Sequence, residues 1–453
     1  MKIKPYIDIV KLVWPLALGM VNTAVMQFAD RAYLASHSQD ALAAVLPAGM
    51  LMWIFAGFFQ SVVGYSSVFV GQFHGEGSPS RCRAAYRGAL GLAVAAGLLS
   101  LPLIPLGDRI LALTTPDAGL LAEKRAYYGI LMAGSVFAYV QMAASAYFTG
   151  LGRTRIVFWA NLLGNALNIG LDPLLIFGCD GGWFVLRPMG IAGAACASLL
   201  AMAVQMALLV YAAERAVRRV PAGETRPADI VGRILRFGVP SGLYTVLNLV
   251  SFAVFVFVTE HVGETDAERK LALAVSNACF TVNYLLFAPM EGFSLGASTL
   301  VAQAIGRGDR NGAARAARRT LVLGVGFVAV LSSLTLLFAD EILDLFDEAA
   351  NGDVAAFHAL GLDLMALMSA WLLFDAADVI LGGALKGAGD TKFVMTWALV
   401  CAFCVWLQLV FAVRRFHNTM PALWSTMILY VLVICVGSAI RWRRGAWRRI
   451  RLT

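Results

Sequence analysis

Apolar runs of about twenty residues recur from one end of this chain to the other, separated by short charged segments or by segments with Gly and Pro. A helix of that length crosses the roughly 30 Å hydrocarbon core of a bilayer and satisfies its own backbone hydrogen bonds there. The composition agrees, with 60% hydrophobic and only 14% charged residues. Strands of alternating polarity, which a membrane barrel needs, are not evident. The chain is therefore predicted to be an all-α polytopic membrane protein.

Counting the apolar runs predicts about twelve transmembrane helices. Their expected ranges are approximately 8–36, 42–74, 86–107, 121–149, 156–178, 190–213, 232–262, 270–305, 319–340, 353–385, 392–414 and 421–441.

Charge alternates between successive loops. Lys and Arg gather around residues 81–87, 153–155, 215–236, 307–319, 386–392 and 441–451, whereas the intervening loops are acidic. The positive-inside rule then predicts that both termini are cytoplasmic, in a bacterial inner membrane. Because the net charge of +8 is spread over these loops, we expect no nucleic-acid partner. The basic tail, 442–453, is expected to contact anionic lipid head groups.

The two halves of the sequence repeat. Gln72-Phe-His-Gly75 matches Gln303-Ala-Ile-Gly306 at an offset of 231 residues, and the TGLGRT and KGAGDT turns match at an offset of 237. An even number of helices in each half gives both halves the same orientation, which is a parallel repeat. We expect an N-terminal six-helix lobe at 1–222 that carries a coupling site and a C-terminal six-helix lobe at 223–441.

A polar stripe interrupts the fifth apolar run. Asn161, Asn165, Asn168 and Asp172 are spaced by four, three and four residues, so a helix places them on one face. Asp172 lies roughly 25 Å from the cytoplasmic end of its helix, and Asp30, in the first helix, lies roughly 28 Å from the same side. The two carboxyl groups are thus expected at similar depth. Ionisable residues inside a membrane are costly and usually functional.

Asp30, Asn168 and Asp172, joined by the hydroxyl of Ser198, would make an oxygen-rich site for Na⁺ or a carboxyl pair that shares a proton. The alternative is a structural polar network between helices one, five and six. Gln27 lies on the Asp30 face of its helix, with Thr23, and could extend the network. Asn161 and Asn165, nearer the cytoplasm, are expected to pack helices or line a cavity.

The C-terminal half has its own acidic residues. Asp375 is expected near the middle of the bilayer, with Asp378 one turn further on, and this pair could form a second part of a coupling system. Glu291 could attract cationic substrates or could pair with another helix. The repeat positions of Asp30 and Asp172 are Phe255 and Leu409, so the halves are expected to share a scaffold but not their chemistry.

Motifs of enzymes are lacking. The sequence contains no phosphate-binding loop, no His-Glu-x-x-His pair and no Gly-x-Ser-x-Gly elbow. Cys401-x-x-Cys404 has neither a second cysteine pair nor a nearby histidine, so packing is expected rather than metal binding. We predict that the protein is not an enzyme and uses no cofactor.

Several motifs together carry a family resemblance: Pro15 followed by Asp30, GQFHGEG and AQAIGRGDR, TGLGRT and KGAGDT, Asn168-x-x-x-Asp172-Pro, and the segment from Gly190 to Ser198. Over nearly its whole length the chain resembles the multidrug and toxic compound extrusion (MATE) transporters. The resemblance implies a V-shaped pair of six-helix lobes that export organic compounds by alternating access.

The resemblance also implies roles for single residues. It places Asp30, Asn168, Asp172 and Ser198 in the cation-coupling site, with Ser198 where a Thr is usual. Asp375 matches an acidic residue of the norfloxacin-type branch, but the Glu with which that branch pairs it is Asn248 here.

The expected function is secondary active antiport, exporting amphipathic or cationic organic compounds in exchange for H⁺ or Na⁺. A lipid-linked oligosaccharide flippase of the same superfamily is the alternative. We expect a monomer.

Overall fold

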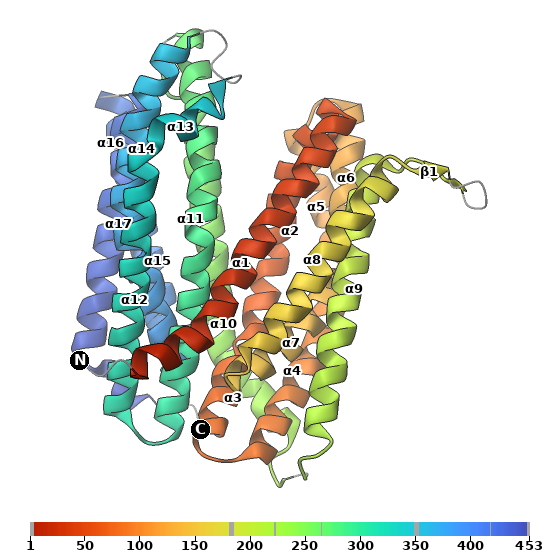
Figure 1. The fold of residues 1–453 in the computed structure, drawn as a ribbon, viewed down its shortest axis with the longest axis vertical. Coiled ribbons are helices and arrows are strands. Elements are labelled where there is room, and N and C mark those ends of the chain that lie inside the picture. The colour runs from red at the N-terminus through yellow and green to blue at the C-terminus, as the bar shows by residue number, and fades with distance from the viewer. Residues whose placement is uncertain are drawn as a thin grey trace.

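The computed structural model describes residues 4–180, 185–221, 223–263, 265–347, 353–416 and 418–450. These are almost entirely helical, and Figure 1 shows two helix bundles that lean apart toward the end that carries α13 (Ala339–Asp344) and β1 (Cys179–Asp180). We call this the open end and the opposite one the closed end.

The N-terminal lobe contains the first nine helices and a short hairpin. Their bounds are α1 (Lys4–His37), α2 (Gln39–Gly64), α3 (Ser66–Gly75), α4 (Pro79–Ser100), α5 (Leu103–Thr114), α6 (Ala118–Ala133), α7 (Ser135–Gly150), α8 (Thr154–Ile176), β1, β2 (Val185–Leu186) and α9 (Gly190–Val217).

The C-terminal lobe contains the remaining helices. Their bounds are α10 (Pro227–Thr259), α11 (Asp266–Gly306), α12 (Arg310–Leu337), α13, α14 (Val354–Gly387), α15 (Thr391–Cys401), α16 (Leu407–Phe416) and α17 (Met420–Arg443), with a π-helical turn at Ala402–Trp406 and a 3₁₀ turn at Ala446–Arg449.

The number of spans agrees with the prediction. Among the described residues, 10 helices are long and apolar enough to cross a membrane, or up to 12 when each of two bent pairs counts as one span. The bends are 45° between α4 and α5 and 42° between α6 and α7. The all-α fold, with about twelve spans in two lobes, is therefore confirmed.

Several predicted boundaries differ from the structure. The arginine-rich segments were expected to be loops, but α4 begins at Pro79 and α12 at Arg310. The polar connection between the lobes shrinks to residues 218–226, because α9 continues to Val217 and α10 already begins at Pro227. These helix ends project beyond the apolar runs, so a hydropathy pattern underestimates their length.

The internal repeat is visible in matched turns. Gly77 and Gly308 have φ angles of 71° and 75°, and Gly152 and Gly389 have φ angles of 74° and 92°. Only glycine adopts such left-handed conformations readily, and each glycine follows the end of a helix. The backbone bonds match too: Arg153 N donates to Phe148 O at 2.8 Å, and Asp390 N donates to Leu385 O at 2.9 Å.

The lobes contact each other closely where α3 meets the last turns of α11. A Cβ atom on Gly75 would overlap the carbonyl oxygen of Gln303, and one on Gly306 would overlap the carbonyl oxygen of Gln72. We call these four residues the interlobe seam. The Gln303 amide also donates to the carbonyl of Gly150, at 2.8 Å. The seam lies at the closed end, where the repeat motifs GQFHG and AQAIG come together.

Candidate functional site

Four polar side chains converge inside the N-terminal lobe. Asp30 comes from α1, Asn168 and Asp172 from α8, and Ser198 from α9. Asn168 and Asp172 are fully buried, whereas Asp30 and Ser198 are 9% and 8% exposed. The structure thus brings together all four residues that the sequence assigned to one site.

Helix packing explains why these groups meet. α8 packs against both α1 and α9. The approach of α9 depends on Gly193, since a Cβ there would overlap the carbonyl oxygen of Leu175 on α8. Five residues further along α9, Ser198 faces the stripe that Asn168 and Asp172 form at i and i+4. The spacing of the polar residues on α8 therefore sets the stripe, and Gly193 sets the distance between α8 and α9.

The Asn168 carboxamide links the other three side chains and can be placed in two orientations. In one, Nδ2 donates to Asp172 Oδ1 and to Ser198 Oγ, both at 3.4 Å. In the other, Nδ2 donates to Asp30 Oδ1 at 2.9 Å and Oδ1 accepts from the Ser198 backbone N–H at 3.3 Å. The second orientation has the shorter bonds, and it joins α1, α8 and α9 through one side chain.

The two carboxyl groups lie close enough to interact with each other directly. Asp172 Oδ2 is buried and accepts no hydrogen bond from the described residues. A direct carboxyl–carboxyl hydrogen bond needs one proton, and a buried carboxylate oxygen without a donor is costly. Tyr127, on α6, lies close enough to interact electrostatically with both groups. The arrangement can therefore take up a proton or a small cation.

A second polar layer lies below this site. Gln205 Nε2 donates to Asn165 Oδ1 at 3.1 Å, and Asn165 Nδ2 donates to Thr23 Oγ1 at 3.3 Å. Gln141 Nε2 donates to Gln205 Oε1 at 2.7 Å and to Asn161 Oδ1 at 3.3 Å. The packing role expected for Asn161 and Asn165 thus has a structural basis. The sequence reasoning missed Gln141 and Gln205, although both interrupt apolar helices.

Gln27 makes a hydrogen bond to the other lobe. Its Oε1 accepts a hydrogen bond from the Tyr284 hydroxyl at 2.8 Å. Tyr284 belongs to α11, so this bond connects the two lobes rather than extending the site within one of them.

The acidic residues of the C-terminal lobe form a separate group. Asp378 is 5% exposed and accepts a hydrogen bond from Ser438 Oγ at 2.7 Å. Asp375 lies near both Asp378 and Glu291. Lys386, which the sequence placed with the basic loops, interacts electrostatically with Glu291 and Asp378. Both alternatives for Glu291, attraction of a cationic substrate and pairing with another helix, remain predictions.

The repeat position of Asp30 contains an aromatic core instead. The Phe255 side chain is fully buried, with its ring centroid 6.1 Å from that of Trp424 and 6.3 Å from that of Trp371. Where the N-terminal lobe has carboxyl groups, the C-terminal lobe is filled with rings.

Comparison with known proteins matches both lobes. The family model described as MatE matches residues 15–174 and 240–412, one segment in each lobe. A probable multidrug resistance protein NorM of Thermotoga maritima is 23% identical over 447 residues, covering 98% of this chain and 93% of the relative. A second NorM, from Bradyrhizobium diazoefficiens, is 26% identical over 461 residues, covering 98% and 94%.

A solved structure shares the fold. It is a multidrug resistance MATE family transporter of the MOP superfamily in an outward-facing conformation, with a TM-score of 0.84 at 19% identity. The alignment covers 98% of this chain and 97% of that one. Since the family model covers most of the chain, in both lobes, the protein belongs to the MatE family and is a MATE transporter.

Proposed function

We propose that this transporter is a proton-coupled antiporter that exports amphipathic or cationic organic compounds. The coupling site is the Asp30–Asp172 pair, held by Asn168 and Ser198 in the lobe formed by residues 1–222. Protons enter from outside, and the organic compound leaves as the lobes at 1–222 and 223–441 rock against each other.

The observation that carries this proposal is the buried, unpaired Asp172 Oδ2 beside the Asp30 carboxyl group. In a poorly solvated lobe, two adjacent carboxylates cannot both stay charged without a counter-charge. A proton shared by the pair supplies that hydrogen bond and removes one charge. Deprotonation restores the repulsion and favours separation of α1 from α8. The proton thus selects between two packings of the same lobe.

Sodium is the second candidate for the coupling ion. Oxygen atoms of Asp30, Asp172 and Asn168, with the Ser198 hydroxyl, form a ligand set that suits a hard cation. We favour the proton because the two carboxyl groups interact directly with each other, an arrangement in which they can share one.

Drug export is favoured over the flippase alternative by two observations. The relatives described above are named multidrug resistance proteins. The charged cluster of the C-terminal lobe has three carboxyl groups, those of the exposed Glu291, the half-buried Asp375 and the buried Asp378, near one Lys386. An acidic excess attracts a cationic compound and repels the pyrophosphate of a lipid-linked sugar.

The positive-inside rule orients the structure within the membrane. The basic turns and the interlobe seam then face the cytoplasm, as do both termini, and the lobes diverge toward the outside (Figure 1). This is the state in which protons from outside reach the pair. At the cytoplasmic side Trp447 is buried and stacks on Trp442 at 4.4 Å, so the basic tail folds onto the lobe, where it would meet anionic lipid. We propose a monomer in a bacterial inner membrane.

The test is transport by the purified protein in liposomes, with a pH gradient or a Na⁺ gradient imposed separately. We expect the pH gradient to drive uphill movement of a cationic dye and the Na⁺ gradient alone to drive none. Dye transport driven by the Na⁺ gradient alone would show that the same site couples transport to sodium. Movement of a lipid-linked oligosaccharide without dye transport would overturn the export function.

A further inference from the structure

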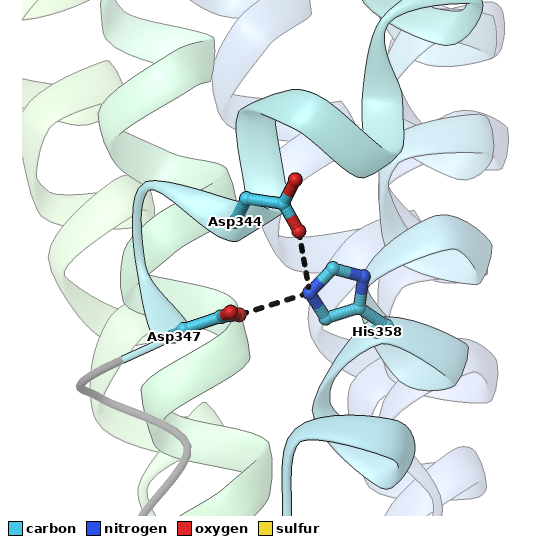
Figure 2. A group of neighbouring side chains, drawn as sticks. All are labelled: Asp344, Asp347 and His358. Atoms are coloured by element: carbon cyan, nitrogen blue, oxygen red, sulfur yellow. Dashed lines mark hydrogen bonds and ion pairs between the residues drawn. The ribbon is translucent and has the colours of Figure 1, made fainter.

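An acidic cluster around one histidine lies at the open end of the C-terminal lobe, far from the coupling site along the chain. Figure 2 shows the His358 imidazole facing Asp344 and Asp347. His358 Nε2 lies 2.9 Å from Asp347 Oδ1 and 3.6 Å from Asp344 Oδ1. One ligand atom from each of the three residues lies within 4.8 Å of the other two. No step of the proposed transport cycle uses these groups.

Packing beneath the cluster fixes its backbone. α13 lies against α14 through Leu343, which is fully buried beside the equally buried Phe357. A Cβ atom on Gly361 would come within 2.6 Å of Leu343 Cδ2, so glycine permits this close approach. Asp344 follows Leu343 directly, and His358 follows Phe357. The apolar contact therefore holds a carboxylate and an imidazole opposite each other before any ligand binds.

A third carboxylate orients the imidazole ring. Asp340 Oδ1 lies 3.5 Å from His358 Nδ1, on the side of the ring away from Asp344 and Asp347. Asp340 and Asp344 are four residues apart on α13, so both point toward α14. A carboxylate on one imidazole nitrogen, with ligand groups at the other, is the arrangement found around metal-bound histidines. His358 is also only 18% exposed, so its ring is held between the two elements.

We propose that His358 Nε2 and one carboxylate oxygen each from Asp344 and Asp347 bind a divalent transition-metal ion such as Zn²⁺. Asp340 is the positioning residue behind the imidazole, and water completes the coordination. Donor atoms around such an ion stand roughly 3.0–3.5 Å apart when each is about 2.0–2.2 Å from the metal. The two separations from His358 Nε2, 2.9 and 3.6 Å, straddle this range, and the two carboxylates, within 4.8 Å of each other, can close on an ion by side-chain rotation. The imidazole selects transition metals over Ca²⁺ and Mg²⁺, which prefer all-oxygen ligands.

The bound ion would join α13 to α14 and neutralise charge at the open end. Without metal, a protonated imidazole between carboxylates could hold the same contact as an ion pair. The two states differ in measurable ways, because an ion pair needs a proton on Nε2 and a metal ligand needs that nitrogen free. Metal binding should therefore weaken as the pH falls below the range in which His358 is neutral.

The experiment is a calorimetric titration of the full-length protein, purified in detergent and freed of metal, with Zn²⁺ at neutral pH. We expect a site that is lost in His358→Ala and weakened at least tenfold in the double variant Asp344→Asn/Asp347→Asn. Asp340→Asn should weaken it by roughly 10- to 100-fold, the usual cost of removing an outer carboxylate. Mg²⁺ should not compete. Zn²⁺ should raise the melting temperature of the wild type but not of His358→Ala.

Two matched controls separate this site from adventitious binding. Asp363 is an exposed carboxylate on the same helix, α14, and His261 is an exposed histidine at the end of α10. Asp363→Asn and His261→Ala should bind Zn²⁺ like the wild type. Co²⁺ gives a second readout, because its visible absorption distinguishes nitrogen and oxygen ligands from cysteine sulfur. Wild-type protein that binds no Zn²⁺, or that binds it as tightly after His358→Ala, would overturn the proposal.

Discussion

Asp172 is the residue on which the proposed chemistry depends most. It is fully buried, it lies beside a second carboxyl group, and its Oδ2 accepts no hydrogen bond within the described part of the chain. Asn168 presents its amide to one carboxyl group or the other, depending on the orientation of the carboxamide. A site with one donor for two acceptors can respond to a single proton, and that is what a coupling site requires.

Asp30→Asn and Asp172→Asn are each expected to reduce gradient-driven dye export to the rate of protein-free liposomes. An amide keeps the shape of the side chain but cannot take up and release a proton. The initial rate of dye transport and the amount of protein in the membrane are the measurements. Asp8→Asn, which replaces an exposed carboxylate of the same α1, should transport normally. Normal transport by both site variants would contradict the assignment.

Among single residues, the sequence identified charged members of the polar networks better than neutral ones. Asp30 and Asp172 stand out because a carboxylate in an apolar run is costly and rare. Gln141 and Gln205 were missed, since one glutamine in a helix does not show which way it points. Lys386 was assigned to a basic loop by its position along the chain. Asp378 lies on the same helix as Lys386, but the electrostatic interaction with Glu291 depends on how α11 packs against α14, which spacing alone cannot give.

Among the elements, the helix ends at the seam are the most tightly constrained. Gly306 is the last residue of α11 and lies against the backbone of α3, where no side chain fits between the two helices. The equivalent Gly75, the last residue of α3, lies against the backbone of α11 in the same way. The glycines in these motifs therefore serve helix approach, in addition to the turns that follow them.

Gly306→Ala is expected to lower both the melting temperature and the export rate. The added methyl group overlaps the Gln72 carbonyl and pushes the lobes apart at the closed end. Gly326→Ala is the matched control, because nothing lies within 4 Å of a Cβ at that position of α12. The control should instead stabilise by roughly 0.5–1 kcal/mol, as alanine does in a helix. Equal effects in both variants would show that the close contact between Gly306 and Gln72 determines neither the stability nor the export rate.

The sequence also predicted most elements but not how they bend. The length and hydropathy of the apolar runs predicted the transmembrane spans, and the offsets between matching motifs predicted the internal repeat. The breaks at Leu101–Pro102 and at Gly134, the short α13 and the β1–β2 hairpin were not predicted. Each depends on contacts between segments. Helix α13, for example, is held by Leu343 against Gly361, and six residues are too few to carry a clear pattern of their own.

For the whole molecule, the relative position of the lobes is the quantity that transport must change. Several hydrogen bonds made by side chains join the lobes. Ser61 Oγ and Thr245 Oγ1 are 2.8 Å apart, and the Tyr65 hydroxyl donates to the carbonyl of Lys386 at 2.8 Å. In the proposed cycle, in which the lobes rock against each other, we expect these contacts to separate.

The double variant Ser61→Cys/Thr245→Cys is expected to form a disulfide that stops transport. The side-chain oxygens of the native pair are 2.8 Å apart, so sulfur atoms at the same two positions should come close enough to bond. Dye export should fall to background after oxidation and recover after reduction. Each single cysteine variant should be insensitive to oxidant. Full activity of the oxidised, cross-linked protein would show that the lobes need not separate here.

The reciprocal contact of Gly75 with Gln303 and of Gly306 with Gln72 has the form of an isologous dimer interface, in which each half presents the same patch to the other. The connection at residues 218–226 makes this a dimer within one chain. Because the two contacts are related by the repeat axis and lie across it from each other, rocking that separates the lobes at the closed end breaks both together. The seam is therefore expected to open cooperatively, as one all-or-none event, while the chemistry of each half remains free to diverge.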